Sequence, residues 1–319
     1  MLEVNNVTKT YVSKKRVTLF TNEKIVKTAV EDVSLVVPRG KIIGILGENG
    51  AGKTTLIKMM STLLIPDKGE IKIDGKDIQD NLKLSRGNIN IISGGEKNLY
   101  WRLTGMENLE YFATLYSIPK HIATPRILSL LKEVGLEEYK DDPVEQYSKG
   151  MKQRLQIAKG LINEPKYLFL DEPTLGLDVS IALEMRQKIK EIAKKYNTGI
   201  LLTTHYMAEA EELCDYLYIL HKGRVVLSGT KSDVFLALNL KNELIITLEP
   251  SFKFQRSKYR DKSFLFKSIE YNEEENIIKI QVSLETELAS CIDELISCGI
   301  RFQQIEFTKP RLEDVILSL

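Results

Sequence analysis

The sequence predicts an α/β fold with a mixed sheet core, a helical subdomain and a small C-terminal α/β domain. Three observations predict it. An apolar strand at residues 41–46 leads into a glycine-rich loop and then into a helical stretch that begins at Lys53. Apolar runs at residues 167–170 and 199–204 each follow a helical stretch, which is typical of a parallel sheet covered by helices. Beyond about residue 238 the pattern changes to short strands with a helix, which indicates a separate unit.

The first domain is expected to span residues 1–236. Strand-like runs at residues 2–7 and 33–37 precede the glycine-rich loop, and the polar, basic segment 13–27 between them fits an edge hairpin or a loop. Amphipathic helical patterns fill about residues 95–165, which predicts a helical subdomain. We expect these helices to be interrupted at Pro119, Pro125, Gly135 and Pro143. Further strands are expected at residues 70–74, 89–92, 216–220 and 224–228.

The second domain is expected to span residues 237–319. Its predicted elements are strands at 243–248, 264–271, 276–282 and 301–308, a helix at 288–298 and a last helix from Arg311. It contains no catalytic constellation of its own.

Composition excludes several classes of protein. The 319 residues include 43% hydrophobic residues, enough for one large and one small domain with proper cores. The 45 basic and 44 acidic residues leave a net charge of +1, so there is no bulk attraction to nucleic acid. No apolar run approaches the roughly 18 to 20 residues of a membrane span. Residues 1–5 resemble no secretory leader, so we expect a cytoplasmic protein.

The loop at residues 47–54 fits the phosphate-loop pattern Gly-x-x-x-x-Gly-Lys-Ser/Thr between a strand and a helix. Its backbone N–H groups and the helix N-terminus predict a site for the phosphates of ATP. Lys53 is expected to reach the β and γ phosphates, and the Thr54 hydroxyl to hold Mg²⁺ that arrives with the nucleotide. The expected nucleotide contacts are Gly47, Glu48, Asn49, Gly50, Ala51, Gly52, Lys53, Thr54 and Thr55.

A second cluster of candidate residues follows the apolar strand at residues 167–170. Asp171 is the expected partner of Mg²⁺, and Glu172 is placed to orient the attacking water. Taken alone, Asp-Glu-Pro also fits a solvated turn. His205 follows another strand, where it is either a packed core residue or a donor to the γ phosphate or the water.

These motifs, together with the segment Tyr-Ser-Lys-Gly-Met at residues 147–151, resemble the ATP-binding subunits of ABC transporters over residues 1 to about 235. The resemblance implies that Ser148 and Gly150 face the γ phosphate bound by a second subunit, so that two subunits pack head to tail. It also implies that Tyr11 stacks on adenine, that His205 is the switch histidine and that Asp178 belongs to the loop through which the two sites communicate. From the residues alone, Ser148 also fits a simple helix cap and Tyr11 a packing residue.

Two departures from the family pattern bear on hydrolysis. The family signature Leu-Ser-Gly-Gly-Gln is altered at Tyr147, Lys149 and Met151, and Lys149 can add positive charge near phosphate. The glutamine that the family places after the strand at 89–92 corresponds to Gly95, where Glu96 or a water would have to substitute. The aromatic segment 98–103 would face the permease by analogy, or form a small satellite core.

The leading hypothesis is therefore an ATP-hydrolysing subunit that powers a separately encoded membrane permease. The C-terminal segment 309–317 resembles the tail of ATPases in drug and polysaccharide exporters, which implies that residues 237–319 are an accessory domain for dimer support or regulation. The exporter resemblance also implies export as the direction. We expect the subunit to lie in the cytoplasm, peripheral on the inner face of the cell membrane. No nucleic-acid partner is expected. Two alternatives stay open: a soluble ABC-type ATPase that acts on ribosomes or DNA, and a regulatory nucleotide-binding partner with weak hydrolysis. The cargo, and homodimer against heterodimer, are undecided by the sequence.

Overall fold

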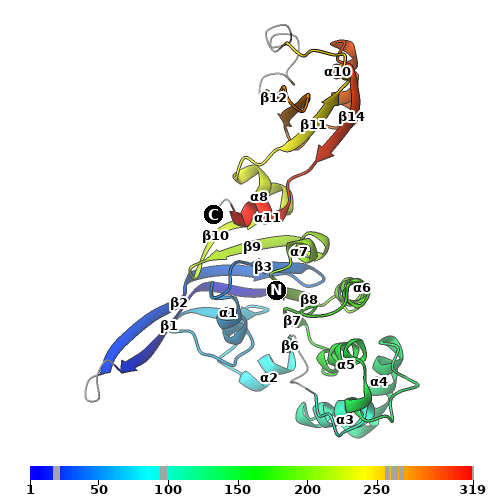
Figure 1. Cartoon of the computed structure of the whole chain (residues 1–319). Coiled ribbons are helices and arrows are strands. Elements are labelled where there is room, and N and C mark those ends of the chain that lie inside the picture. Colours follow the sequence, from blue (N-terminus) through cyan, green and yellow to red (C-terminus); the bar gives the residue numbers. More distant parts are fainter. Residues whose placement is uncertain (17–21, 94–98, 256–258, 260–264, 266–268, 318–319) are drawn as a thin grey trace. The chain divides into compact units, whose positions relative to one another are not determined.

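The computed structural model describes residues 1–16, 22–93, 99–255, 259, 265 and 269–317 (Figure 1). The chain divides into two compact units, Met1–Thr230 and Lys231–Leu319. The sequence predicted this division between residues 236 and 237. It lies earlier because helix α8 (Lys231–Ala237) contacts helix α11 (Leu312–Leu317) near the end of the chain and so belongs to the second unit.

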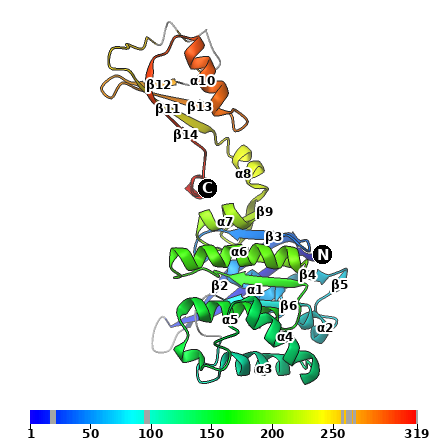
Figure 2. The same ribbon diagram turned by 90° about the vertical axis from the view of Figure 1, so that its right-hand side faces the viewer.

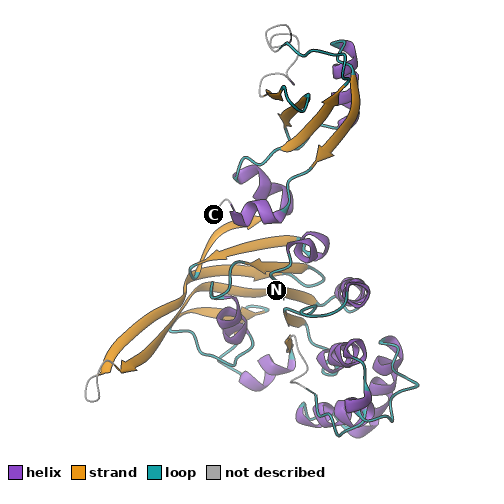
Figure 3. Cartoon of the chain, viewed as in Figure 1, coloured by secondary structure: helices purple, strands orange, loops and turns teal. Residues whose placement is uncertain are grey.

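The core of the first unit is a six-stranded mixed sheet, seen in orange in Figure 3. Its strand order is β10-β9-β3-β8-β7-β6, and all neighbours are parallel except β9 and β10. The strands are β3 (Ile42–Leu46), β6 (Ile89–Ser93), β7 (Tyr167–Asp171), β8 (Gly199–Thr203), β9 (Tyr216–His221) and β10 (Arg224–Gly229). The predicted α/β fold with a mixed sheet is confirmed. The carboxyl ends of β7 and β8 meet at one edge, with Asp171 opposite Thr203.

Alternate residues of the central strands enter two different hydrophobic cores. Ile42, Leu168 and Ile200 belong to a core that they share with apolar residues of the helical subdomain and of helix α6 (Val179–Lys195). Their neighbours Ile43 and Phe169 face the opposite way and pack with α1 (Lys53–Met60). Because both faces are covered, the strands are nearly continuous apolar runs, which is why the sequence pattern reveals them.

A second sheet, in the order β2-β1-β4-β5, packs on the α1 side of the first unit. It consists of β1 (Leu2–Arg16), β2 (Asn22–Val37), β4 (Lys68–Ile73) and β5 (Lys76–Asp77). Strands β1 and β2 pair all the way from Leu2 and Val37 to Arg16 and Asn22, so the hairpin is far longer than the apolar runs alone predict. Residues 17–21 lie outside the described part of the chain.

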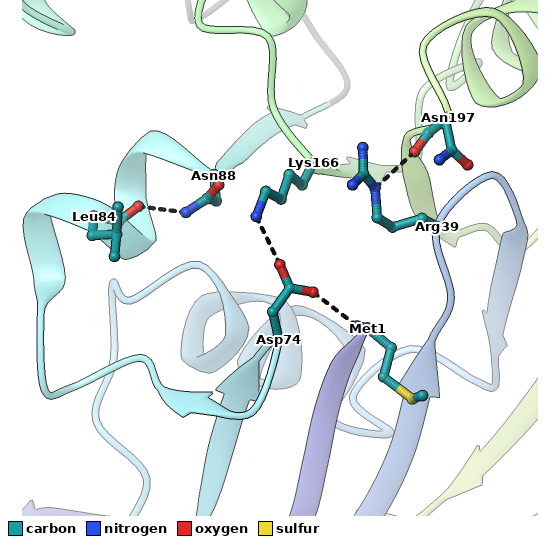
Figure 4. Close-up of polar contacts among 7 residues, drawn as sticks. All are labelled: Met1, Arg39, Asp74, Leu84, Asn88, Lys166 and Asn197. Carbon is teal, nitrogen blue, oxygen red and sulfur yellow. Dashed lines mark hydrogen bonds and ion pairs between the residues drawn. The ribbon is translucent and has the colours of Figure 1, made fainter.

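Asp74, in the turn after β4, ties this second sheet to the start of β7 (Figure 4). Its carboxylate accepts hydrogen bonds from the Nζ of Lys166 at 2.7 Å and from the N-terminal amine of Met1 at 2.9 Å. These two cations lower the pKa of Asp74 to about 2. Nearby, the Nε of Arg39 donates to the backbone oxygen of Asn197 at 3.2 Å.

The helical subdomain comprises α3 (Gly105–Leu115), α4 (Lys120–Glu133), the short η1 (Val144–Gln146) and α5 (Lys149–Leu161). Its three longer helices contact one another and lie beyond the β6 edge of the six-stranded sheet in both views (Figures 1 and 2). A reciprocal pair of bonds between Thr104 and Glu107 caps α3. The expected interruption at Pro125 is wrong: α4 continues through it, although proline removes one backbone hydrogen bond of the helix. The packing of α4 on the core at residues such as Ile127 and Leu131 offsets this loss.

The remaining helices of the first unit flank these elements. They are α2 (Leu82–Gly87), α6 (Val179–Lys195) and α7 (Met207–Leu213). None of the helices in the described part of the chain combines the length and the apolar character that crossing a membrane requires.

The second unit is an antiparallel sheet with a helix on one face. The strand order is β12-β13-β11-β14, with β11 (Asn242–Leu248), β12 (Ile269–Asn272), β13 (Ile277–Val282), β14 (Phe302–Thr308) and helix α10 (Leu288–Ser297). Cys291 and Leu295 of α10 pack into the core of this sheet. The strand predicted at 264–271 begins at Ile269, and part of the predicted range lies outside the described residues.

Candidate nucleotide-binding site

Two glycines give the phosphate loop its shape. Helix α1 begins at Lys53, and Gly52 before it has a φ of 109°, which favours glycine. Gly47 has a φ of 149°, and a Cβ there would lie 2.2 Å from the backbone oxygen of Leu220. A Cβ on Gly52 would lie 2.4 Å from the backbone oxygen of Ala29. The two positions therefore need glycine because other backbone segments approach them closely.

The ammonium group of Lys53 is held inside this loop. The side chain is only 7% exposed, and its Nζ donates to the backbone oxygens of Gly47 at 2.6 Å and Glu48 at 3.0 Å. Burial lowers the pKa of Lys53, while the nearby carboxylates of Glu172 and Asp171 act in the opposite direction. Two backbone oxygens thus position the cation, and phosphate oxygens are acceptors that can take their place.

A cavity of about 260 Å³ opens over the loop. Its lining is formed by Tyr11, Lys27, Ala29, Asn49, Gly50, Gly52, Lys53, Thr54, Thr55 and Glu172. Gly50, with a φ of 86°, would place a Cβ in open space, so the backbone there is accessible to a ligand. The lining brings most of the predicted nucleotide contacts together with Glu172 and Tyr11.

Three residues of the phosphate loop that were predicted to contact the nucleotide lie outside the cavity lining. Gly47, Glu48 and Ala51 are not part of the cavity lining. The first two offer their backbone oxygens to Lys53, and the backbone oxygen of Ala51 accepts from the N–H of Gly223 at 3.0 Å. These residues shape the loop and anchor it to the β9–β10 turn.

Lys27 is a cavity residue that the sequence reasoning missed. It lies directly opposite Tyr11 in the pairing of β1 with β2, so both side chains stand at the same point of the hairpin. The only sequence signal was the basic character of segment 13–27, which did not reveal the pairing. An aromatic ring beside an ammonium group can bind a flat base together with its attached phosphates.

The acid pair lies at the carboxyl edge of the sheet, where β7 ends. The Oγ1 of Thr203, on the neighbouring strand, donates to the Oδ1 of Asp171 at 2.5 Å. Glu172 adopts a left-handed conformation with a φ of 53°, and its N–H donates to the backbone oxygen of Thr203 at 2.9 Å. Such a conformation costs free energy in a residue other than glycine, and Glu172 lines the cavity.

His205 is paired with Glu172. Its Nδ1 lies 3.3 Å from the Oε1 of Glu172, and its ring lies 4.1 Å from that of Tyr206. The histidine side chain is 39% exposed, so it is not the buried core residue that the alternative interpretation described. The structure therefore joins the two predicted catalytic residues in one contact.

The oxygen groups of Thr54 and Asp171 suit a magnesium ion that is brought by a nucleotide. Magnesium is commonly bound through one or two protein oxygens, with phosphate oxygens and waters completing its six ligands. The described residues contain no cluster of three or more His, Cys, Asp or Glu side chains that could hold a metal ion. The two oxygen donors, Thr54 and Asp171, fit a magnesium ion by their chemistry.

Comparisons with known proteins identify the family. The family model described as ABC transporter matches residues 30–175. The chain is 40% identical over 216 residues to the ABC transporter ATP-binding protein NatA of Bacillus subtilis, covering 68% of this chain and 87% of that protein. It is 32% identical over 325 residues to the linearmycin resistance ATP-binding protein LnrL of Bacillus subtilis, covering 100% of this chain and 98% of that protein.

The chain belongs to the ABC transporter ATP-binding proteins. A solved structure of an ATP-binding subunit of an ABC transporter superposes with a TM-score of 0.62 at 34% identity, covering 75% of this chain and 93% of that one. The dimeric ATP-binding cassette MJ0796, solved in a post-hydrolysis state with ADP and Pi, gives a TM-score of 0.61 at 26% identity, covering 72% and 98%. The predicted family and its ATPase activity are thus confirmed.

The signature segment of this ABC transporter ATP-binding protein forms the N-terminus of α5. Ser148 is the cap residue, and its Oγ accepts from the N–H of Met151 at 3.2 Å. A Cβ on Gly150 would lie 3.0 Å from the Cδ1 of Ile181 on α6. Neither Ser148 nor Gly150 is part of the cavity lining, and Asp178, the cap residue of α6, is not part of it either. The structure of the chain thus leaves these three predicted contacts outside its own nucleotide cavity.

Of the two departures from the family pattern, the structure describes Lys149 and does not describe Gly95. The Nζ of Lys149 donates to the backbone oxygen of Gly176 in the same chain. Gly95 and Glu96 lie in residues 94–98, outside the described part of the structure.

The aromatic segment is divided between core and surface. Leu99 is buried in the core of the helical subdomain, whereas Tyr100 is 47% and Trp101 49% exposed. The Tyr100 ring packs edge-on against Tyr111 with centroids 4.6 Å apart, and the Nζ of Lys152 lies 5.0 Å from the centroid of the Trp101 ring. The segment is therefore partly a packing element and partly an exposed aromatic surface.

Proposed function

We propose that this ATPase closes head to tail with a second ATP-binding subunit around two ATP molecules with Mg²⁺, and that closure drives an export permease encoded separately. The observation that carries this proposal is the division of the site. One cavity gathers the phosphate loop, Tyr11 and Glu172, while Ser148 and Gly150 stand outside it at a helix N-terminus. A helix N-terminus, where the first N–H groups have no partner within the helix, suits a phosphate bound by another subunit.

In this proposal the phosphate loop binds the phosphates of ATP, and Lys53 neutralises part of their negative charge. The loop N–H groups and the Lys53 ammonium receive the phosphates, and Tyr11 with Lys27 holds the base side of the nucleotide. Thr54 and Asp171 would hold Mg²⁺, which supplies charge neutralisation on the phosphates when bound.

Glu172 and His205 act on the water. The Glu172 carboxylate orients the attacking water, which is the main protein task in phosphoryl transfer besides charge stabilisation. The Nδ1 of His205 lies 3.3 Å from the Oε1 of that carboxylate, and Glu172 lines the cavity. In this proposal His205 positions the carboxylate that orients the water.

The dimer is tested with Glu172→Gln. Loss of the carboxylate stops hydrolysis while the phosphate loop still binds ATP, so the variant should accumulate as an ATP-bound dimer. Light scattering after size-exclusion chromatography would show dimer mass with ATP and Mg²⁺, and monomer mass without nucleotide. Adding Lys53→Ala to the same variant should abolish the dimer. A variant that remains monomeric at saturating ATP would overturn the proposed closure.

Transport is tested by purification from membranes. Affinity capture of the full chain from detergent-solubilised membranes should recover an integral membrane protein, with the ATPase itself peripheral on the cytoplasmic face. The names of two relatives, a linearmycin resistance protein and the daunorubicin resistance protein DrrA3 of Streptomyces coeruleorubidus, support export as the direction. Co-sedimentation with ribosomes and absence from membranes would favour the soluble alternative. Steady-state ATPase activity near background would favour a regulatory partner.

A further inference from the structure

The loop between the acid pair and α6, residues 172–178, is held by α5 at two backbone oxygens. The Nε2 of Gln153 donates to the backbone oxygen of Pro173 at 2.7 Å, and Gln153 is only 5% exposed. The Nζ of Lys149 donates to the backbone oxygen of Gly176. One anchor is therefore buried next to Glu172, and the other is exposed in the middle of the loop.

The position of Lys149 over the loop is supported by a second observation. Gly176 has a φ of 69°, and a Cβ built on it would lie 2.9 Å from the Nζ of Lys149. The ammonium group thus lies close to Gly176, whose left-handed backbone conformation favours glycine. A charged donor makes a stronger hydrogen bond to a carbonyl group than a neutral donor does.

Two turns with backbone hydrogen bonds connect Gly176 to Glu172. The N–H of Leu175 donates to the backbone oxygen of Glu172 at 3.2 Å, and the N–H of Leu177 donates to that of Thr174 at 3.1 Å. Gly176 lies between these two donors. Fixing its carbonyl group therefore restrains the turn that starts at Glu172, whose backbone is in a costly left-handed conformation.

We propose that Lys149 is a positioning residue that fixes residues 172–178 of its own chain, and so keeps Glu172 ready to orient water. The role rests on the proposed function of Glu172. It assigns to Lys149 a task that differs from contacting the phosphate of the second subunit. The two roles differ in where they act: positioning is already present in the nucleotide-free subunit, whereas a phosphate contact appears only in the ATP-bound dimer.

The experiment is hydrogen exchange of the nucleotide-free chain, comparing the unmodified protein with Lys149→Met, Lys149→Arg and Lys194→Met. Methionine removes the donor but keeps an unbranched chain, and arginine keeps a charged donor. Lys194 is an exposed lysine near the end of α6 and serves as the matched control for loss of a surface charge. The amides of Leu175 and Leu177 should exchange about two- to tenfold faster in Lys149→Met, the range expected for one hydrogen bond. The other two variants should match the unmodified protein.

Activity provides the second readout. Lys149→Met should lower kcat several-fold with little change in KM for ATP, and Lys149→Arg should restore it. Unchanged exchange in Lys149→Met, or an equal increase in Lys149→Arg, would overturn the proposal. So would a raised KM for ATP together with normal exchange, which is the result expected of a phosphate contact. Because the exchange is measured without nucleotide, it fails or succeeds independently of the dimerisation test of Glu172→Gln.

Discussion

The hydrogen bond between Thr203 and Asp171 predicts how strongly the ATPase depends on magnesium. Thr203 is fully buried, and its hydroxyl is the side-chain donor to the Oδ1 of Asp171 at 2.5 Å. Valine has nearly the same shape as threonine but cannot donate. Thr203→Val should therefore leave the packing of β8 in place while releasing the carboxylate that is expected to hold Mg²⁺.

The magnitude follows from two independent considerations. A hydrogen bond to a charged group contributes about 1.5–3 kcal/mol, which corresponds to about 10- to 100-fold in an equilibrium constant. Loss of a group that orients a metal ligand costs about the same factor in metal affinity. We expect the concentration of free Mg²⁺ that gives half-maximal ATPase activity to rise about 10- to 100-fold in Thr203→Val.

The assay is phosphate release at fixed ATP over a range of free Mg²⁺. Thr203→Ser keeps the hydroxyl and should retain most of the magnesium affinity. Binding of a fluorescent ATP analogue in EDTA should be unchanged in both variants, because the phosphate loop is not altered. An unchanged magnesium requirement in Thr203→Val, or an equal loss in Thr203→Ser, would refute the role given to this hydrogen bond.

Two further predictions concern the framework of the site. Gly47→Ala should lower the free energy of unfolding by about 3 kcal/mol, because its Cβ would lie 2.2 Å from the backbone oxygen of Leu220 and its φ of 149° is strained for alanine. Urea unfolding measures this, and a loss below about 1 kcal/mol would contradict it. Burial raises the pKa of the fully buried Glu209, whose Oε1 accepts from the Oγ1 of Thr174 at 2.8 Å. The resulting stability is present below the ordinary glutamate pKa and is lost as the pH rises through the raised one, so Glu209→Gln should gain stability relative to the unmodified protein as the pH rises above the ordinary glutamate pKa. Parallel melting temperatures across this range would exclude a titrating Glu209.

The local parts of the site could be predicted from the sequence. The phosphate loop is contiguous, and its glycines, lysine and threonine act through backbone shape and helix dipole that neighbouring residues determine. Asp171 and Glu172 were also predictable, because an apolar strand that ends in two acids delivers them to a sheet edge. The continuous burial of β3, β7 and β8 made these strands visible as apolar runs in the sequence, for the same local reason.

Contacts between distant segments could not be predicted in this way. Thr203 is 32 residues from Asp171 and reaches it only because β7 and β8 pair in a particular register. Lys27 reaches the cavity because it pairs with Tyr11 in the β1–β2 hairpin. The sequence of this hairpin is polar and lacks the apolar pattern that predicts a strand. A register is set by the whole sheet, so the residues that it brings together carry no signal in their own neighbourhood.

Lys149 shows how the two kinds of information combine. The sequence marks it as a departure from the family signature, and charge alone suggests a contact with phosphate. The structure gives its ammonium group an acceptor in its own chain, the backbone oxygen of Gly176. A lysine that is satisfied before ATP arrives must exchange that bond if it is to bind phosphate, and the exchange would release the loop that starts at Glu172. In the proposed positioning role, Lys149 thus connects the signature helix to Glu172 through the backbone of residues 172–178.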